Sequence, residues 1–167
     1  MAPSVLVAFA TKHGSTQEVA ERIAGVLAEH GLRVELAPAG TVSRLEGFDA
    51  VVLGGALYMG RWHGDARAFL RRHRNELEQL RFAAFGMGPK TLAEQDVEAS
   101  RAQLLRALGP SRPATTAIFG GVVDPTKLRF PLDRLPATDA RDWDAIDGWA
   151  REVAGLVATV RPAPVPV

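Results

Sequence analysis

The feature that most limits how this chain can fold is an apolar strand that passes directly into a helix. Val5–Ala10 is a continuous apolar run, and it stops in a short turn that carries three hydroxyl side chains and one glycine (residues 11–16, TKHGST). A helical pattern begins within that turn and covers Ser15–His30, with its apolar residues on one face. A fully apolar strand followed by a helix is typical of a parallel sheet that is covered on both faces.

The same alternation continues to the end of the chain. Apolar runs predict further buried strands, and an alternating run predicts an edge strand: Ala50–Gly55, Phe82–Gly86, Ala117–Gly121 and, at the edge, Arg33–Ala37. Helical periodicity predicts three more helices, over Ala66–Leu80, Ala93–Leu108 and Asp142–Val160. We therefore expect an α/β fold, a three-layer, doubly wound, five-stranded parallel sheet in the order 2-1-3-4-5.

Composition limits the classes of function. The 167 residues suit one domain, which we place at 1–160, followed by a proline-rich tail at 161–167. A formal net charge of +1 gives no general attraction for nucleic acid. There is no cysteine, which excludes disulfides and thiolate metal sites, and the four histidines have no metal-ligand spacing. We expect a cytoplasmic protein with no metal, no signal peptide and no transmembrane segment.

In this strand order, ligands bind at the carboxyl ends of the strands, beside the loops after strands one, three and four. The first loop can bind a phosphate, because a helix N-terminus, hydroxyls and a close backbone approach at glycine all suit an anion. Its candidate residues are Thr11, Lys12, His13, Gly14, Ser15 and Thr16. The alternative is a plain capping box, Ser15 with Glu18, which needs no ligand. The chain has neither the G-x-G-x-x-G nor the Walker pattern, and carboxylates that a phospho-acceptor domain needs are missing.

Residues 11–16 match the [ST]-x-x-G-x-T pattern, and the chain thereby resembles the flavodoxin-fold family, whose loop holds the phosphate of flavin mononucleotide (FMN). Within it, the chain is most similar to the menaquinone-dependent protoporphyrinogen oxidase group. Three segments carry this similarity: FATKHGSTQEVA, FDAVVLGGALYMGRWH and DWDAIDGWAREVA. The resemblance implies an FMN cofactor, with a small substrate or a quinone as reaction partner.

The second and third loops are predicted to contact the flavin ring. Flat or soft apolar side chains and glycines suit such a ring, and the second loop offers Ala56, Leu57, Tyr58, Met59, Gly60 and Trp62. The third loop offers Gly86, Met87 and Gly88. The alternative is that these aromatic and sulfur side chains only pack beneath the loops. Arg61 and His63 are the candidate catalytic residues, because positive charge near the ring stabilises a reduced anion.

Two functions remain open from the sequence. One is an FMN-dependent oxidoreductase, similar to protoporphyrinogen oxidase, that passes electrons from a small substrate to a quinone-type acceptor. The other is a flavodoxin-type electron carrier that serves a redox partner protein; a homodimer fits either function. In the oxidase group the segment after the fifth strand is long, basic and aromatic and is linked to the membrane. Here Thr126–Arg141 is interrupted by prolines and has no obvious amphipathic helix.

Overall fold

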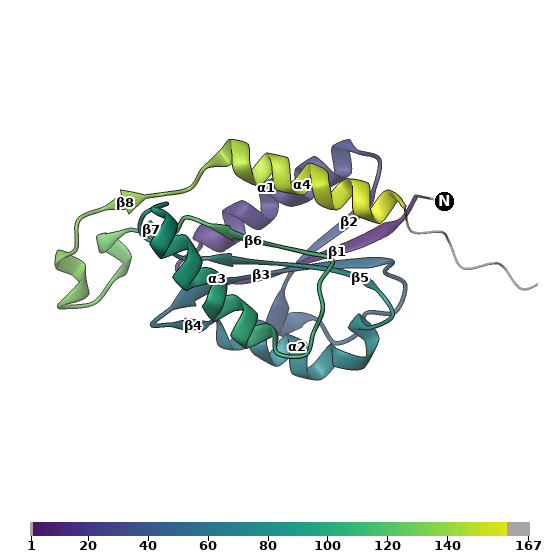
Figure 1. Ribbon diagram of the computed structural model, residues 1–167, viewed down its shortest axis with the longest axis horizontal. Helices are drawn as coiled ribbons and strands as arrows, with labels where there is room; N and C mark the ends of the chain where they lie inside the picture. Colours follow the sequence, from purple (N-terminus) through teal and green to yellow (C-terminus); the bar gives the residue numbers. More distant parts are fainter. Residues whose placement is uncertain (1, 160–167) are drawn as a thin grey trace, which may run out of the picture.

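The computed structural model describes residues 2–159, and its centre is a parallel sheet (Figure 1). The parallel strands lie in the order β2-β1-β3-β5-β6, which is 2-1-3-4-5 when they alone are numbered. Their bounds are β1 Ser4–Ala10, β2 Arg33–Pro38, β3 Ala50–Tyr58, β5 Arg81–Met87 and β6 Thr115–Phe119. The predicted fold class and strand order are confirmed, with the alternating strand β2 at the edge.

Four helices cover the two faces of the sheet. They are α1 Ser15–Glu29, α2 Gly64–Leu77, α3 Glu94–Leu108 and α4 Trp143–Ala158. Helices α1 and α4 lie on one face and α2 and α3 on the other (Figure 1). Side chains alternate along β1, so that Val5 and Val7 pack under α1 and α4 while Leu6 and Ala8 pack under α2 and α3. Both faces of the central strands are therefore buried, as their continuous apolar sequences require.

The helix ends follow the local sequence. Asp142 caps α4, because its carboxylate accepts a hydrogen bond from the backbone N–H of Ala145 at 3.1 Å. Gly31 and Gly109 follow α1 and α3 with positive φ angles of 83° and 54°, which is the usual role of glycine after a helix. The end of the predicted last helix at residue 160 and the predicted tail 161–167 lie outside the described residues.

Two small structures were not predicted. After β3 the chain turns back at Met59 and Gly60, both with positive φ, and β4 (Arg61–Trp62) pairs antiparallel with β3. The connection between β6 and α4 contains a second, two-stranded sheet of β7 (Val122–Val123) and β8 (Thr138–Asp139). Residues 122–139, which we call the arm, extend beyond the main sheet at the left of Figure 1. Between its strands the arm forms only two short 3₁₀ turns, in agreement with the absence of an obvious amphipathic helix.

Candidate functional site

The loops predicted to bind a ligand meet at the carboxyl edge of the sheet. The register pairs Ala10 with Gly55 and Ala56 with Met87, and it pairs Met87 with Phe119. The strands therefore end close to one another, and the first, second and third loops leave from the same edge. The structure brings the three predicted loops to one place, with the base of the arm beside them.

The first loop does not form a capping box. Gly14 is the N-cap residue of α1 with φ of 94°, and no side chain caps the helix. Thr11 instead accepts a hydrogen bond from the N–H of Gly14 through Oγ1 at 2.8 Å, which holds the turn. Glu18, the second half of the expected box, forms an ion pair with Arg141 at 2.7 Å. The capping-box alternative is therefore wrong, and the first helix begins without a side-chain partner for its N–H groups.

Two polar side-chain atoms of this loop are buried without a partner. Thr16 is 0% exposed, and neither its Oγ1 nor Nε2 of His13 has a hydrogen-bond partner among the described residues. Burial, followed by the nearby charges of Lys12 and Lys127, lowers the pKa of His13 from its ordinary value of 6.5. The imidazole is therefore mostly neutral at pH 7. An unpaired buried hydroxyl costs free energy, so native proteins keep one mainly where something else binds it.

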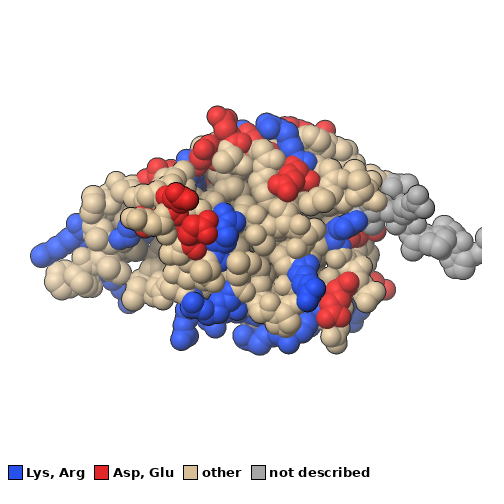
Figure 2. All heavy atoms as spheres, viewed as in Figure 1, with Lys and Arg blue, Asp and Glu red and all other residues tan. Residues whose placement is uncertain are grey.

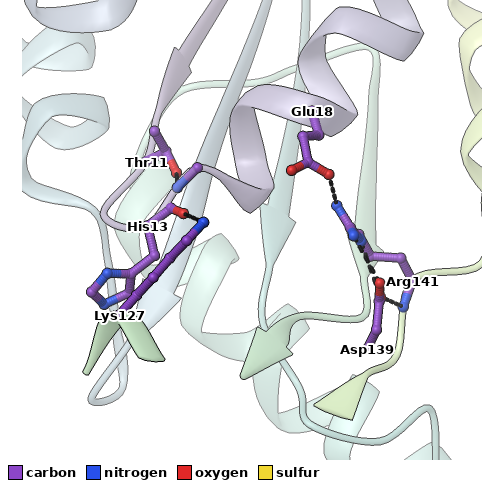
Figure 3. Close-up of polar contacts among 7 residues, drawn as sticks. Thr11, His13, Glu18, Lys127, Asp139 and Arg141 are labelled. Carbon is purple, nitrogen blue, oxygen red and sulfur yellow. Dashed lines mark hydrogen bonds and ion pairs between the residues drawn. The ribbon is translucent and has the colours of Figure 1, made fainter. Parts of the chain in front are cut away.

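Two contacts that the sequence did not predict join the arm to the first loop, and a residue just after the arm's last strand to the start of α1 (Figure 3). Lys127 donates from Nζ to the backbone carbonyl of His13 at 3.0 Å. Arg141, just after the arm, donates to both Glu18 and Asp139 at 2.7 Å. These ion pairs raise the pKa of Arg141, and its guanidinium holds the pKa of Asp139 below the ordinary carboxyl value. No sequence spacing signals these contacts, because the partners lie 114 and 123 residues apart.

Two candidate side chains of the second loop are exposed, and a third is buried. Tyr58 is 41% exposed at the end of β3, with the Lys12 ammonium 4.0 Å from its ring centre, and Met59 is 83% exposed at the turn. Trp62 is 1% exposed and donates from Nε1 to the carbonyl of Gly55 at 3.0 Å. The indole of Trp62 therefore packs beneath the hairpin, and its predicted contact with the flavin ring stays a prediction.

The third loop is also closely packed. A Cβ atom at Gly86 or Gly88 would lie 2.9 Å from the side chain of Leu57, so both glycines leave room for that leucine. Met87 is 2% exposed and belongs to the core. Gly121 lies against Gly88, where a Cβ would meet the Gly88 carbonyl at 2.8 Å. The glycines thus serve packing here, and the predicted contact of Met87 with a ring has no exposed surface to support it.

The candidate catalytic residues lie on β4 and at the start of α2. Arg61 is exposed on β4, and His63 is the N-cap of α2, where its Nδ1 accepts from the N–H of Asp65 at 3.0 Å. Because Nδ1 accepts, a neutral His63 ring carries its proton on Nε2. Figure 2 shows basic side chains gathered along the edge of the molecule where α2 lies in Figure 1. Arg61 and His63 thus stand at the start of a positively charged edge.

Comparison with known proteins decides which family has this arrangement. A profile of the flavodoxin domain matches residues 6–135, which is most of the chain. The chain belongs to the flavodoxin domain family. Protoporphyrinogen IX dehydrogenase (quinone) of Escherichia coli is 25% identical to it over 174 residues, and the alignment covers 90% of this chain and 94% of that protein. The family and this relative together make the chain a flavodoxin-type oxidoreductase or electron carrier.

Solved structures agree with the flavodoxin fold. The flavodoxin of Streptococcus pneumonia TIGR4 superposes with a TM-score of 0.63 at 16% identity, over 92% of this chain and 99% of that one. Rubredoxin oxygen:oxidoreductase of Desulfovibrio gigas gives a TM-score of 0.59 at 15% identity, and this chain spans 37% of that protein. A flavodoxin fold indicates a flavin cofactor, typically FMN. Within residues 2–159, no helix combines the length and the apolar character that crossing a bilayer requires.

Proposed function

We propose that this flavodoxin domain is an FMN-dependent oxidoreductase that passes electrons from a small substrate to a quinone-type acceptor, similar to protoporphyrinogen oxidase. The observation that carries the proposal is the pair of unpartnered buried atoms, Thr16 Oγ1 and His13 Nε2, in the loop where the family pattern predicts a phosphate. The quinone in the name of the Escherichia coli relative supports the choice of acceptor.

The first loop fits the phosphate of FMN. The hydroxyl of Thr16 and the free backbone N–H groups at the start of α1 are donors that need an acceptor, and so is the neutral imidazole of His13 when Nε2 carries its proton. Gly14 has φ of 94°, a conformation that side-chain-bearing residues rarely adopt. In this proposal Thr11 fixes the turn through its bond to Gly14, while Ser15 adds a second hydroxyl at the start of the helix.

Tyr58 and Met59 are the side chains that fit beside the flavin ring, because both are exposed at the carboxyl edge of the sheet. Ala56 and Leu57, which precede Tyr58 at the end of β3, are half-buried. Gly86 and Gly88, at and after the end of β5, have no side chains and pack closely on Leu57. We expect them to contact a flavin ring through their backbone atoms.

When bound, FMN supplies the transfer of electrons or hydride, and the protein supplies orientation and charge. The guanidinium of Arg61 and the Nε2 proton of His63 would bind carboxylates of an anionic substrate such as a porphyrinogen. Their position at the start of α2 continues the basic edge seen in Figure 2. That charge would also lower the free energy of a reduced, anionic ring.

A one-electron carrier is the second candidate, and the exposed hairpin favours it. Tyr58 and Met59 present apolar surface at the edge of the sheet, which suits contact with a redox partner protein. A carrier would transfer electrons to that protein without turning over a small substrate.

Two measurements test the proposed function. Titration of the protein with FMN should quench the flavin fluorescence at a one-to-one ratio, and an absence of quenching would refute FMN binding. The FMN-loaded protein should then oxidise protoporphyrinogen with a quinone as acceptor, and Arg61→Gln should raise KM for that substrate more than the control Arg71→Gln on α2. Fast electron transfer to a partner protein without protoporphyrinogen turnover would support the carrier instead.

A further inference from the structure

We infer that Lys127, which comes from the arm and not from the first loop, is a ligand of the flavin phosphate and makes the site select FMN over unphosphorylated riboflavin. The inference rests on the proposed binding of FMN. It adds a residue that lies outside the loop pattern and 114 positions further along the chain.

The position of Lys127 is fixed from two sides. Its Nζ donates to the backbone carbonyl of His13 at 3.0 Å, and it is the nearest atom, at 3.9 Å, to the point where a Cβ on Gly14 would lie. On the arm, the Asp124 carboxylate accepts from both the N–H and the hydroxyl of Thr126, at 3.0 and 2.6 Å. These bonds stabilise the 3₁₀ turn Pro125–Lys127 from within the arm. The hydrogen bond from Lys127 to His13 joins this turn to the first loop (Figure 3).

The charge of Lys127 is available to a ligand. An ammonium has three donors, and the described contacts of Lys127 use one of them, for the carbonyl of His13. Lys127 has no ion pair among residues 2–159, in contrast to Arg141, which binds two carboxylates beside the same loop. The nearest acid on the arm, Asp124, is bound to Thr126, and those hydrogen bonds hold its pKa below the ordinary value.

A cation would strengthen phosphate binding by the first loop. A phosphate ester carries about two negative charges near pH 7, and the hydroxyls and N–H groups at a helix start bind it without neutralising those charges, so an ammonium beside them adds a charge-assisted hydrogen bond. Of the two lysines that lower the pKa of His13, Lys12 has its ammonium over the ring of Tyr58. Lys127, which contacts His13 and lies next to Gly14 in the same loop, can therefore turn toward a phosphate without leaving an aromatic ring. Riboflavin lacks the phosphate, so its binding would gain nothing from the charge of Lys127.

The test compares FMN with riboflavin in three variants of the complete chain, using fluorescence quenching to measure Kd. Lys127→Gln should weaken FMN binding by about ten-fold, the usual size of a charge-assisted hydrogen bond, and should leave riboflavin binding unchanged. Lys127→Arg should restore most of the affinity for FMN. The matched control is Arg129→Gln, which removes an exposed positive charge two residues further along the arm and should change neither Kd.

Each other outcome overturns the inference. Equal losses for FMN and riboflavin would mean that Lys127 only supports the shape of the loop. Equal losses of FMN affinity in Lys127→Gln and Arg129→Gln would mean that the general charge of the arm acts, and an unchanged Kd would mean that Lys127 does not contact the phosphate. If the unmodified protein binds no FMN at all, the proposed function fails first, and that result is distinct from the other three.

Discussion

The substitution Thr16→Val should change the stability of the empty protein and its affinity for FMN in opposite directions. Thr16 is 0% exposed and its hydroxyl has no partner among the described residues. A buried unpaired hydroxyl costs about 1–3 kcal/mol. Valine has nearly the same shape, the same branching at Cβ and a similar helix propensity, so the exchange removes the cost with little new strain. We expect the T16V protein to be more stable without flavin by roughly 1 kcal/mol.

The same change should weaken FMN binding, because the hydroxyl is then missing where the phosphate needs a donor. Loss of one such hydrogen bond corresponds to about a ten-fold increase in Kd. Urea unfolding of the flavin-free protein gives the first quantity, and FMN fluorescence quenching gives the second. The opposite signs are the useful part of this experiment, because a merely structural threonine would not produce them.

Thr115→Val is the matched control for this experiment. The Thr115 hydroxyl accepts from Nε1 of Trp149 at 3.2 Å and donates to Glu152 at 3.3 Å, on β6 and away from the first loop. Its loss should destabilise the protein by about 1 kcal/mol and leave the affinity for FMN unchanged. If T16V instead loses stability as T115V does and binds FMN normally, the hydroxyl of Thr16 has no role in ligand binding and our interpretation of the loop is wrong.

Three further predictions concern the same edge of the sheet. Gly14→Ala should lower the free energy of unfolding by about 1 kcal/mol in urea denaturation, because its φ of 94° is unfavourable for alanine; an unchanged value would mean that the turn adapts freely. Since Arg141 holds the pKa of Asp139 below its ordinary 3.8, the contribution of this pair to stability should be complete above about pH 4 and be lost as the pH falls through the lowered pKa. Arg141→Gln should weaken that acid dependence in thermal unfolding at pH 2–6, and equal slopes in both proteins would contradict it. Arg61→Glu should make the midpoint potential of bound FMN more negative by roughly 30 mV in a redox titration, which is about 1.4 kcal/mol for two electrons; no shift would mean that Arg61 is far from the ring.

The sequence predicted well the fold and the meeting of the three candidate loops at one edge of the sheet, because both depend on local patterns. Continuous apolar strands such as Val5–Ala10 must be buried on both faces, which gives the three layers, and the strand order follows the usual doubly wound topology. The first loop was predicted for the same reason, since a strand end and a helix start in succession must lie at the carboxyl edge.

The errors concern contacts between residues far apart in the chain. An S-x-x-E pattern describes a capping box only if nothing else binds the glutamate, and here Arg141 binds Glu18. Lys127 had no pattern to mark it, because its role depends on how the arm folds back. A local sequence pattern cannot predict these contacts, because they depend on which residues from distant parts of the chain lie close in the folded protein.

The two long-range contacts Lys127–His13 and Arg141–Glu18 also affect the order in which the chain folds. Lys127 meets His13 across 114 residues and Arg141 meets Glu18 across 123, so each contact closes a loop of more than two thirds of the 167-residue chain. Such contacts form late, because closing a long loop costs conformational entropy before the contact contributes any stabilising free energy. During synthesis the first loop emerges early, and its contact with Lys127 and the contact of Glu18 with Arg141 cannot form until residues 127 and 141 have left the ribosome. If Lys127 binds the flavin phosphate as we propose, FMN should therefore reach its full affinity only after the arm has folded back onto the first loop.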